Sequence, residues 1–360
     1  MIITYIYLPE NNHRYRVQVH RTDLADAIDR TGQHRAYLLK FQEFIENTSH
    51  AQEICEASDI IVIHRYLLGM VLKVVQYWKA RDKKILVDFN EAFDLISPEM
   101  PAYSFWMKGN IQPEFSDWLN GGSNTMDPAP LEQFKWGMHL VDAATVPSIR
   151  LAHDWQAFTK VFLVPDYLNV NHYLTVKQNH HDEIRIGLSG EGFNPASLFS
   201  SGVASALEQV CLRRSNVKVI FSNVPSDVLE KINIVPDQLE VYSQASFDKW
   251  VQVLSGLDLG VAPVDGDYDL RMGSFNVMEF MVMKIPWAAS NTLPYRDLAR
   301  YGWLVPNSVN NWESSLLELI DHIDAYRAEA VGEPFLFALS QDINENISKV
   351  IDIYNSILLS

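Results

Sequence analysis

Short apolar runs alternate along this chain with stretches of helical spacing. Such runs, bounded by polar turns, are typical of strands buried on both faces of a parallel sheet. They fall at 2–8, 60–63, 84–87, 143–146, 161–164, 184–188, 217–221, 257–264, 287–290 and 303–305. Because a predicted helix separates most neighbouring runs, the pattern predicts an α/β protein assembled from βαβ units.

The stretch 257–290 holds one complete unit of this kind. An apolar strand ends near Val264, a polar loop follows, and a helix begins near Ser274 and ends before Pro286. Ligands of such units bind at the carboxyl ends of the strands, where a helix N-terminus offers free N–H groups suited to phosphate. Glu279 lies just inside this helix, and a carboxylate there can accept hydrogen bonds from a ribose.

Polar side chains also follow two apolar runs in the first half of the chain. The run 60–63 ends at His64 and Arg65, and the run 84–87 is followed by Asp88, Asn90 and Glu91. The carboxyl ends of parallel strands share one edge of a sheet, so we expect these residues to lie at a functional edge.

The chain length and one polar segment predict two domains. A chain of 360 residues exceeds what a single core usually supports. Residues 166–183 have no apolar period and contain His180 and His181, so they are interpreted as a hinge. The predicted organisation is a first domain 1–165, the hinge 166–183, a second domain 184–335 and a C-terminal segment 336–360 that carries an amphipathic helix. The first strand of the second domain ends at Gly190 and Glu191, where glycine permits close approach of the backbone to a ligand.

The segment 96–130 is rich in proline, glycine and aromatic residues and has no clear period. A loop-rich insertion near a sheet edge forms either a lid or substrate wall, or a packed surface excursion with no role in binding. The sequence leaves both interpretations open.

Composition and charge narrow the classes of partner. The formal net charge of −16 weighs against broad electrostatic binding to duplex DNA or an anionic membrane, although a local basic patch remains compatible with it. Cys55 and Cys211 lie far apart without metal spacing, which favours reduced thiols and a cytoplasmic protein. No signal peptide and no run of about 18 apolar residues for a membrane span is visible.

One histidine pair and one acidic loop resemble metal sites only superficially. His180 and His181 lack a third ligand in register. The loop 265–269 does not fit an EF-hand, which requires glycine where Leu270 stands and glutamate where Asn276 stands. We therefore expect no metal, and we interpret the carboxylates of this loop as a solvated turn.

Several motifs resemble one known family. DLGVAPV, VMEFMVMKIPWAAS, LPYRDL and GWLVP are similar to the donor-binding half of a GT-B glycosyltransferase, nearest to family four. Glu279, Pro286, Ala289 and Ser290 match its pattern position by position. VDAATVPS, VFLVPDYLNVNHY, IVIHR and ILVDFNEAFD are similar to motifs of its first domain. Met272, Gly273 and Asn276 occupy places where the family often has a second acidic residue or a Lys-Ser pair, which leaves Arg271 as the cation at hand.

The resemblance implies a fold and an activity. The fold would be GT-B, two Rossmann-like doubly wound domains facing across a cleft, with the terminal helix either crossing back to the first domain or packing on the second. The first domain would bind the acceptor and the second the nucleotide sugar. The activity would be transfer of a sugar from a UDP- or GDP-sugar to a hydroxyl of a glycan or other acceptor, without metal and without a permanently bound cofactor. Family four implies retention of the sugar configuration, which needs no strong base. Inversion stays open, and it would require a carboxylate or His64 as base.

The implied site residues form three groups: catalytic His64, Asp88 and Arg271; donor-binding Gly190, Glu191, Gly273, Ser274, Phe275 and Glu279; and acceptor-binding Arg65, Asn90 and Glu91. Three alternatives stay open. One is a catalytically inactive GT-B partner subunit, and another is a sugar-nucleotide epimerase or hydrolase on the same fold. The third is a transferase acting on modified DNA bases, against which the acidic charge weighs.

Overall fold

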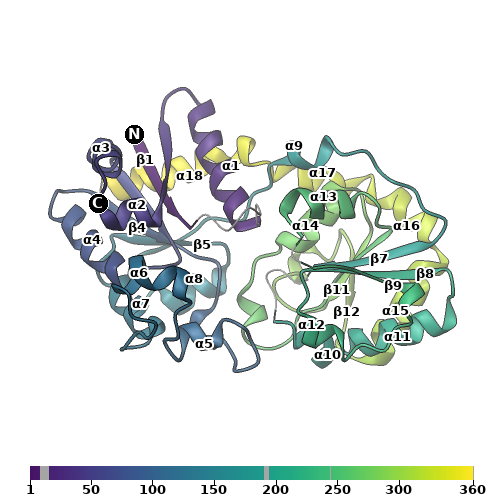
Figure 1. Ribbon diagram of the computed structural model, residues 1–360. Coiled ribbons are helices and arrows are strands. Elements are labelled where there is room, and N and C mark those ends of the chain that lie inside the picture. Colours follow the sequence, from purple (N-terminus) through teal and green to yellow (C-terminus); the bar gives the residue numbers. More distant parts are fainter. Residues whose placement is uncertain (9–15, 190–193, 244, 360) are drawn as a thin grey trace. The chain divides into compact units, whose positions relative to one another are not determined.

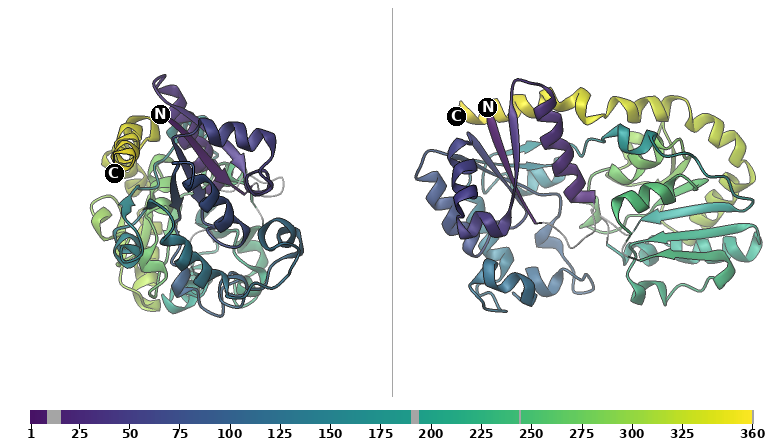
Figure 2. Two further views of the ribbon diagram at one scale, coloured as in Figure 1. Left: turned by 90° about the vertical axis from the view of Figure 1, so that its left-hand side faces the viewer. Right: turned by 45° about the horizontal axis from the view of Figure 1, so that its top comes forward.

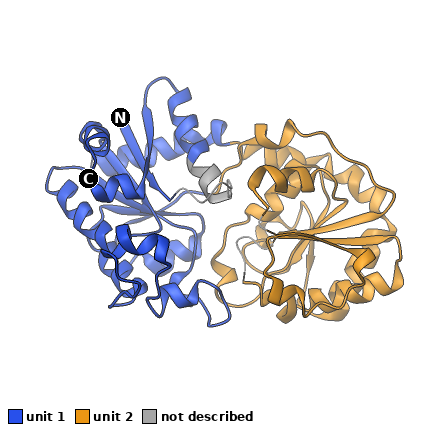
Figure 3. Cartoon of the chain, viewed as in Figure 1, with its two compact units in different colours: residues 1–12, 17–165, 343–360 blue, residues 13–16, 166–342 orange. Residues whose placement is uncertain are grey.

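A computed structural model describes residues 1–8, 16–189, 194–243 and 245–359 (Figure 1). The chain divides into two compact units, coloured separately in Figure 3. Unit 1 contains the N-terminal strand, the stretch Val17–Pro165 and the C-terminal stretch from Ile343, and unit 2 contains Asp166–Asp342. Each unit has its own parallel sheet with helices packed on it, so the predicted α/β class is confirmed.

The sheet of unit 1 has six parallel strands in the order β2-β1-β3-β4-β5-β6. They are β1 (Ile2–Tyr7), β2 (Arg35–Lys40), β3 (Ile60–His64), β4 (Lys84–Asp88), β5 (Ala143–Val146) and β6 (Val161–Leu163). β3 is buried along its whole length, as its run of β-branched residues predicts. The strand order reverses direction between β1 and β3, so the topological switch point of this sheet lies there.

The helices of unit 1 connect these strands in a doubly wound pattern. They are α1 (Arg16–Arg30), α2 (Phe41–Glu46), α3 (Ser49–Ala57), α4 (Met70–Lys79), α7 (Pro130–Met138) and α8 (Ile149–Trp155). The insertion after β4 adds η1 (Phe93–Leu95), α5 (Tyr103–Trp106) and α6 (Pro113–Asn120). It therefore has short helices of its own, which its aperiodic sequence did not predict.

The sheet of unit 2 also has six parallel strands, in the order β12-β11-β10-β7-β8-β9. They are β7 (Ile184–Ser189), β8 (Val217–Ser222), β9 (Leu239–Tyr242), β10 (Leu259–Ala262), β11 (Trp287–Ser290) and β12 (Trp303–Val305). The order reverses between β10 and β7, which places a second switch point there. β10, its following helix and β11 form the predicted βαβ unit.

The helices of unit 2 are α9 (Val170–Leu174), α10 (Ser197–Ser200), α11 (Val203–Arg213), α12 (Ser226–Leu229), α13 (Phe247–Leu254), α14 (Phe275–Val282), α15 (Val309–Asp321), α16 (Ile323–Ala330) and α17 (Glu333–Ser340), with 3-10 turns η2 (Pro236–Gln238), η3 (Asp269–Arg271) and η4 (Arg296–Leu298). Between β11 and β12 the chain forms only η4. After β12 the helical stretch is broken at His322, whose backbone is not helical and which separates α15 from α16.

The last helix, α18 (Ile343–Leu358), groups with unit 1. Its apolar face is the predicted one, and all six of its members are buried: Ile343, Ile347, Val350, Ile351, Tyr354 and Ile357. The hydroxyl groups of Tyr354 and Tyr5 of β1 are 3.0 Å apart and share a hydrogen bond. Figure 2 shows α18 beside β1 in both views. The terminal helix thus completes the core of the domain in which the chain begins.

The segment predicted as a polar hinge, 166–183, is part of unit 2 and contains α9. Val170 and Tyr173 of this helix are buried. Leu168 N donates a hydrogen bond of 3.0 Å to Gln341 O and forms a parallel bridge with Asp342. The two stretches that connect unit 2 to unit 1 therefore lie side by side inside unit 2. In the described part of the chain, no helix is long and apolar enough to span a membrane.

Candidate functional site

The predicted polar residues of unit 1 meet at the carboxyl edge of its sheet. His64 is the last residue of β3 and is in parallel register with Asp88, the last residue of β4. Asp88 is in turn in register with Thr145 of β5, whose Oγ1 donates a 2.5 Å hydrogen bond to Asp88 Oδ1. His64 and Asp88 are 6% and 8% exposed, so both side chains are held among the strand ends. An imidazole beside a hydrogen-bonded carboxylate can position or deprotonate a hydroxyl group.

Arg65 and Glu91 are brought together at the same edge. Arg65 Nη2 lies 2.6 Å from Glu91 Oε1. The Arg65 backbone N–H donates to Asp88 O at 3.0 Å, and its φ of 65° lies in the left-handed region. A non-glycine residue in this region is uncommon and is held there by its surroundings. Asn90, the third predicted acceptor residue, is half-buried on the same loop.

A cavity of about 550 Å³ in unit 1 opens beside Arg65. We call it the aromatic pocket. The side chains that define it are Leu8, Arg65, Tyr66, Ser104, Phe105, Trp106, Asn110, Gln112, Phe115 and Trp118. Most of them come from the insertion 96–130, so this segment lines a cavity; its role as a substrate wall stays a prediction.

In unit 2 the loop between β10 and α14 carries the predicted cation and amides. Arg271 ends η3, and its Nη1 donates to Asp267 O at 2.8 Å and to Asp267 Oδ1 at 3.3 Å. Gly273, Ser274 and Phe275 are half-buried, and Phe275 is the first residue of α14. The predicted residues therefore lie at a helix N-terminus following the carboxyl end of a strand, as the sequence indicated. Gly190 and Glu191 lie outside the described residues.

Glu279 has no exposed surface. Tyr173 Oη of α9 donates to Glu279 Oε1 at 2.9 Å, and Trp250 Nε1 of α13 donates to Glu279 Oε2 at 3.0 Å. Each carboxylate oxygen thus accepts a hydrogen bond from an aromatic side chain of unit 2. The sequence did not reveal these two donors, because they come from elements far along the chain. The predicted ribose contact of Glu279 stays a prediction.

The acidic loop 265–269 is not the uniformly solvated turn that was expected. Asp269 is fully buried, whereas Asp267 is exposed. Ser197 Oγ donates a short hydrogen bond to Asp269 Oδ2, and Asn194 N donates to Asp269 Oδ1 at 2.7 Å. Burial nevertheless raises the pKa of Asp269 to about 6, since desolvation outweighs these bonds. The carboxyl group ties the loop after β10 to the start of α10. In the ranges that the structure describes, no three His, Cys, Asp or Glu side chains are grouped as metal ligands.

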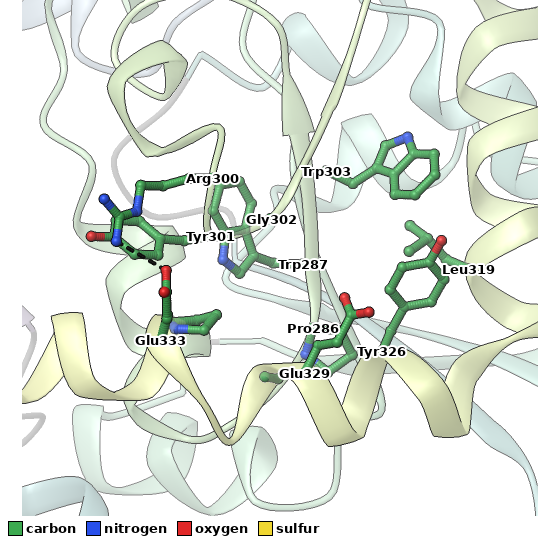
Figure 4. A pocket seen from close by; sticks show the side chains of 12 residues that line it. Pro286, Trp287, Arg300, Tyr301, Gly302, Trp303, Leu319, Tyr326, Glu329 and Glu333 are labelled. Atoms are coloured by element: carbon green, nitrogen blue, oxygen red, sulfur yellow. Dashed lines mark hydrogen bonds and ion pairs between the residues drawn. The ribbon is translucent and has the colours of Figure 1, made fainter.

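A second cavity, of about 410 Å³, lies at the opposite edge of the unit 2 sheet (Figure 4). Pro286 and Gly302, which line it, directly precede β11 and β12, so the cavity is at the amino ends of these strands. The indole of Trp287 packs against the backbone of Gly302. A Cβ added to Gly302 would lie 2.2 Å from a carbon of that indole. Ligands of open α/β sheets bind at the carboxyl ends, which separates this cavity from the predicted donor site.

Solved structures share this fold over nearly the whole chain. Sucrose-phosphate synthase from Thermosynechococcus elongatus superposes with a TM-score of 0.66 at 11% identity, covering 99% of each chain. Anabaena HepE in complex with UDP-glucose superposes with a TM-score of 0.62 at 12% identity, covering 98% of this chain and 99% of that one. UDP-GlcNAc 2-epimerase from Neisseria meningitidis bound to UDP-GlcNAc superposes with a TM-score of 0.52 at 11% identity, covering 100% of each chain.

No family model matches the sequence. No curated protein matches it either. The structural similarities show that the chain has the GT-B fold, which confirms the fold predicted from the motifs. The resemblance to family four stays a prediction.

Proposed function

We propose that this protein is a glycosyltransferase that moves a sugar from a UDP-sugar to an acceptor hydroxyl. The observation that carries the proposal is the placement of polar groups at the carboxyl ends of the strands in both sheets of a GT-B fold. Similar structures contain UDP-glucose and UDP-GlcNAc, which supports a nucleotide sugar as substrate. The uridine base is favoured over guanosine because of these two structures.

Unit 2 would bind the donor. Glycosyl transfer breaks the bond between the anomeric carbon and the diphosphate, so negative charge develops on the leaving phosphate. The N-terminal amides of α14, at Gly273, Ser274 and Phe275, would accept that charge together with the guanidinium of Arg271. Glu279 would hold the ribose, and Gly190 and Glu191 would approach the diphosphate or sugar.

Unit 1 would bind the acceptor. His64 and Asp88 lie at adjacent strand ends and would orient the attacking hydroxyl, with Arg65, Asn90 and Glu91 around them. Reaction with retention, as family four implies, needs no strong base, so their role would be positioning and transfer of the hydroxyl proton. The proposal uses these protein groups for charge stabilisation and, as the resemblance implies, neither a metal nor a resident cofactor.

The decisive experiment is a calorimetric titration of UDP, GDP, UDP-glucose and UDP-GlcNAc, followed by an assay for UDP release with and without candidate acceptors. The proposal predicts binding of UDP and acceptor-dependent UDP release. An inactive GT-B subunit predicts neither binding nor release with any of these compounds.

A second candidate function is epimerisation of a UDP-sugar, favoured by the similarity to an epimerase bound to UDP-GlcNAc. It needs no acceptor. NMR of UDP-GlcNAc incubated with the protein alone distinguishes the two, because an epimerase produces the C2 epimer, whereas a transferase leaves the sugar configuration unchanged at that carbon.

A further inference from the structure

The aromatic pocket occupies the topological switch point of the unit 1 sheet. Leu8 directly follows β1 and Arg65 directly follows β3, and the strand order reverses between these two strands. Open α/β sheets bind their ligands at this position. The volume of about 550 Å³ lies within the range of about 300–1,000 Å³ common for small-molecule sites.

Four half-buried rings line the pocket: Tyr66, Phe105, Phe115 and Trp118. Tyr66 makes an edge contact with Phe105, with ring centroids 6.0 Å apart, and Trp118 makes one with Phe115 at 5.8 Å. Phe41 lies behind them and stacks on Trp118. These side chains therefore present aromatic surface to the cavity instead of burying all of it against one another.

The wall of the pocket is anchored to the domain core. Trp106 is 2% exposed and stacks on Phe93 with ring centroids 3.9 Å apart. A Cβ on Gly69 would stand 2.2 Å from Leu119 O, so glycine at the start of α4 allows the end of α6 to approach closely. A site held in this way before the ligand arrives loses little conformational freedom on binding.

The charge of the pocket is balanced. Among the described residues that line it, Arg65 alone carries a charged side chain, and that guanidinium is paired with Glu91 at 2.6 Å. A phosphorylated or carboxylated ligand would gain little from a cation that is already paired, and a cationic ligand would meet Arg65. The pocket therefore suits an uncharged ligand.

Hydroxyl and amide groups lie beside the rings. Ser104, Asn110 and Gln112 are exposed and line the pocket, and Asn110 Nδ2 donates to Ser104 Oγ at 2.9 Å. Amides offer donors and acceptors together, which matches the hydroxyl groups of a sugar. The C–H bonds on the face of a pyranose carry small positive charges, which the negative face of an aromatic ring attracts. A flat aromatic ring without polar substituents would use the rings but not the amides.

We propose that the aromatic pocket binds an uncharged pyranose ring of the acceptor, so that the acceptor substrate is a neutral glycoside or glycan. This inference rests on the proposed transferase function and specifies its acceptor class. Arg65, which lines the pocket, directly follows His64, so the proposal places the bound sugar next to the edge formed by His64 and Asp88.

The test measures sugar binding and donor binding separately. Saturation-transfer NMR of the full chain would use the methyl glycosides of glucose, galactose, mannose and N-acetylglucosamine, each at millimolar concentration, and 4-methylphenol as an aromatic probe. Trp118→Ala should weaken binding of the preferred glycoside about tenfold, the value of one lost ring contact. Trp118→Phe should retain most of it. Trp136→Ala is the matched control, because Trp136 is 54% exposed on α7 and does not line the pocket.

Calorimetry with UDP keeps this inference distinct from the proposed function. Trp118→Ala should bind UDP as the wild type does. If the wild type binds none of the four glycosides, if it binds only 4-methylphenol, or if glycoside binding survives in Trp118→Ala, the pocket is not a pyranose site. If instead UDP fails to bind while a glycoside does, the pyranose site stands and the transferase proposal fails.

Discussion

Tyr173 and Glu279, 106 positions apart in the sequence, are joined by a buried hydrogen bond of 2.9 Å between the phenol and one carboxylate oxygen. Trp250 Nε1 donates a hydrogen bond of 3.0 Å to the other carboxylate oxygen of Glu279. The glutamate that matches the family motif thus also holds α9, α13 and α14 together. Substitution of Glu279 can separate its contribution to stability from its proposed contribution to donor binding.

Glu279→Ala should lower the free energy of unfolding by about 2–4 kcal/mol, because two buried donors lose a charged acceptor. If Glu279 also binds the donor ribose, the same change should weaken UDP binding about ten- to a hundredfold, and Glu279→Gln should lose less since its amide oxygen still accepts. Urea denaturation and UDP calorimetry measure the two effects. Tyr173→Phe is the control, which removes one donor and keeps the carboxylate. Equal UDP affinity in wild type and Glu279→Ala would leave Glu279 a structural role only.

Asp88→Ala should reduce sugar transfer far more than UDP binding, because Asp88 lies at the acceptor edge of unit 1 beside His64. Thr145→Val removes the 2.5 Å hydrogen bond to Asp88 and should produce a smaller loss of kcat. Steady-state kinetics with a saturating donor, together with UDP calorimetry, would show the difference. Parallel losses of transfer and UDP affinity in Asp88→Ala would move this residue to the donor side.

Arg271→Ala should lower kcat with little change in UDP affinity, since a cation near the leaving phosphate matters most as charge develops. Its guanidinium is held by Asp267, so Asp267→Ala should give a weaker form of the same effect by releasing it. The measurement is single-turnover UDP release. A large fall in UDP affinity with unchanged kcat would show ground-state binding instead.

Asp269 should make stability depend on pH. Its pKa is about 6 in the folded protein and about 4 when unfolded, so between these values the folded state holds a proton that the unfolded state has released. This contribution is fully present below about pH 4 and is lost as pH rises through about 6, by about 2–3 kcal/mol. Urea denaturation of wild type and Asp269→Asn from pH 4 to 7 isolates it, because other carboxyl groups titrate in both. Parallel pH profiles of the two proteins would contradict the prediction.

Gly69→Ala should destabilise the protein more than Gly32→Ala does. Both glycines have positive φ, 58° and 68°, but only Gly69 faces a backbone oxygen, at 2.2 Å from the added Cβ. Gly32→Ala should cost about 1–2 kcal/mol of backbone strain alone. The extra cost in Gly69→Ala combines the contact with Leu119 O and the backbone strain at a ψ of −134°, a conformation nearly restricted to glycine, and thermal or urea unfolding would report it. Equal costs in the two variants would contradict the prediction.

The central strands were predictable because they carry continuous apolar runs, such as residues 60–63 of β3. β2 and β9 were not predicted. Both are only partly buried; the apolar residues 36–39 of β2 lie between Arg35 and Lys40, and Glu240 interrupts β9. The helix α9 inside the predicted hinge was not foreseen, because Tyr173 donates to Glu279, a partner that no local pattern could reveal.

The residues predicted at strand ends lie there, because strand ends are visible in the sequence. His64, Asp88 and Arg65 are examples, and Thr145 could have been added, since it lies in the predicted run 143–146 in register with Asp88. Their roles in a site stay predictions. Asp269 was mistaken for a solvated residue because its burial comes from Ser197, 72 positions away. Burial by segments distant in the sequence raises the pKa of this carboxyl group and leaves no signal in its own loop.

The bridge between Leu168 and Asp342 pairs the beginning and the end of the continuous stretch Asp166–Asp342, which lies in unit 2. The ribosome releases the continuous stretch Asp166–Asp342 before it releases α18. Unit 2 can therefore pack its sheet while the chain is still growing, as domains generally fold as units. Unit 1, although its strands emerge first, exposes the β1 surface around Tyr5 until α18 arrives. The domain that is synthesised first is completed last, so an early end of translation would leave unit 1 as the partner of chaperones and proteases.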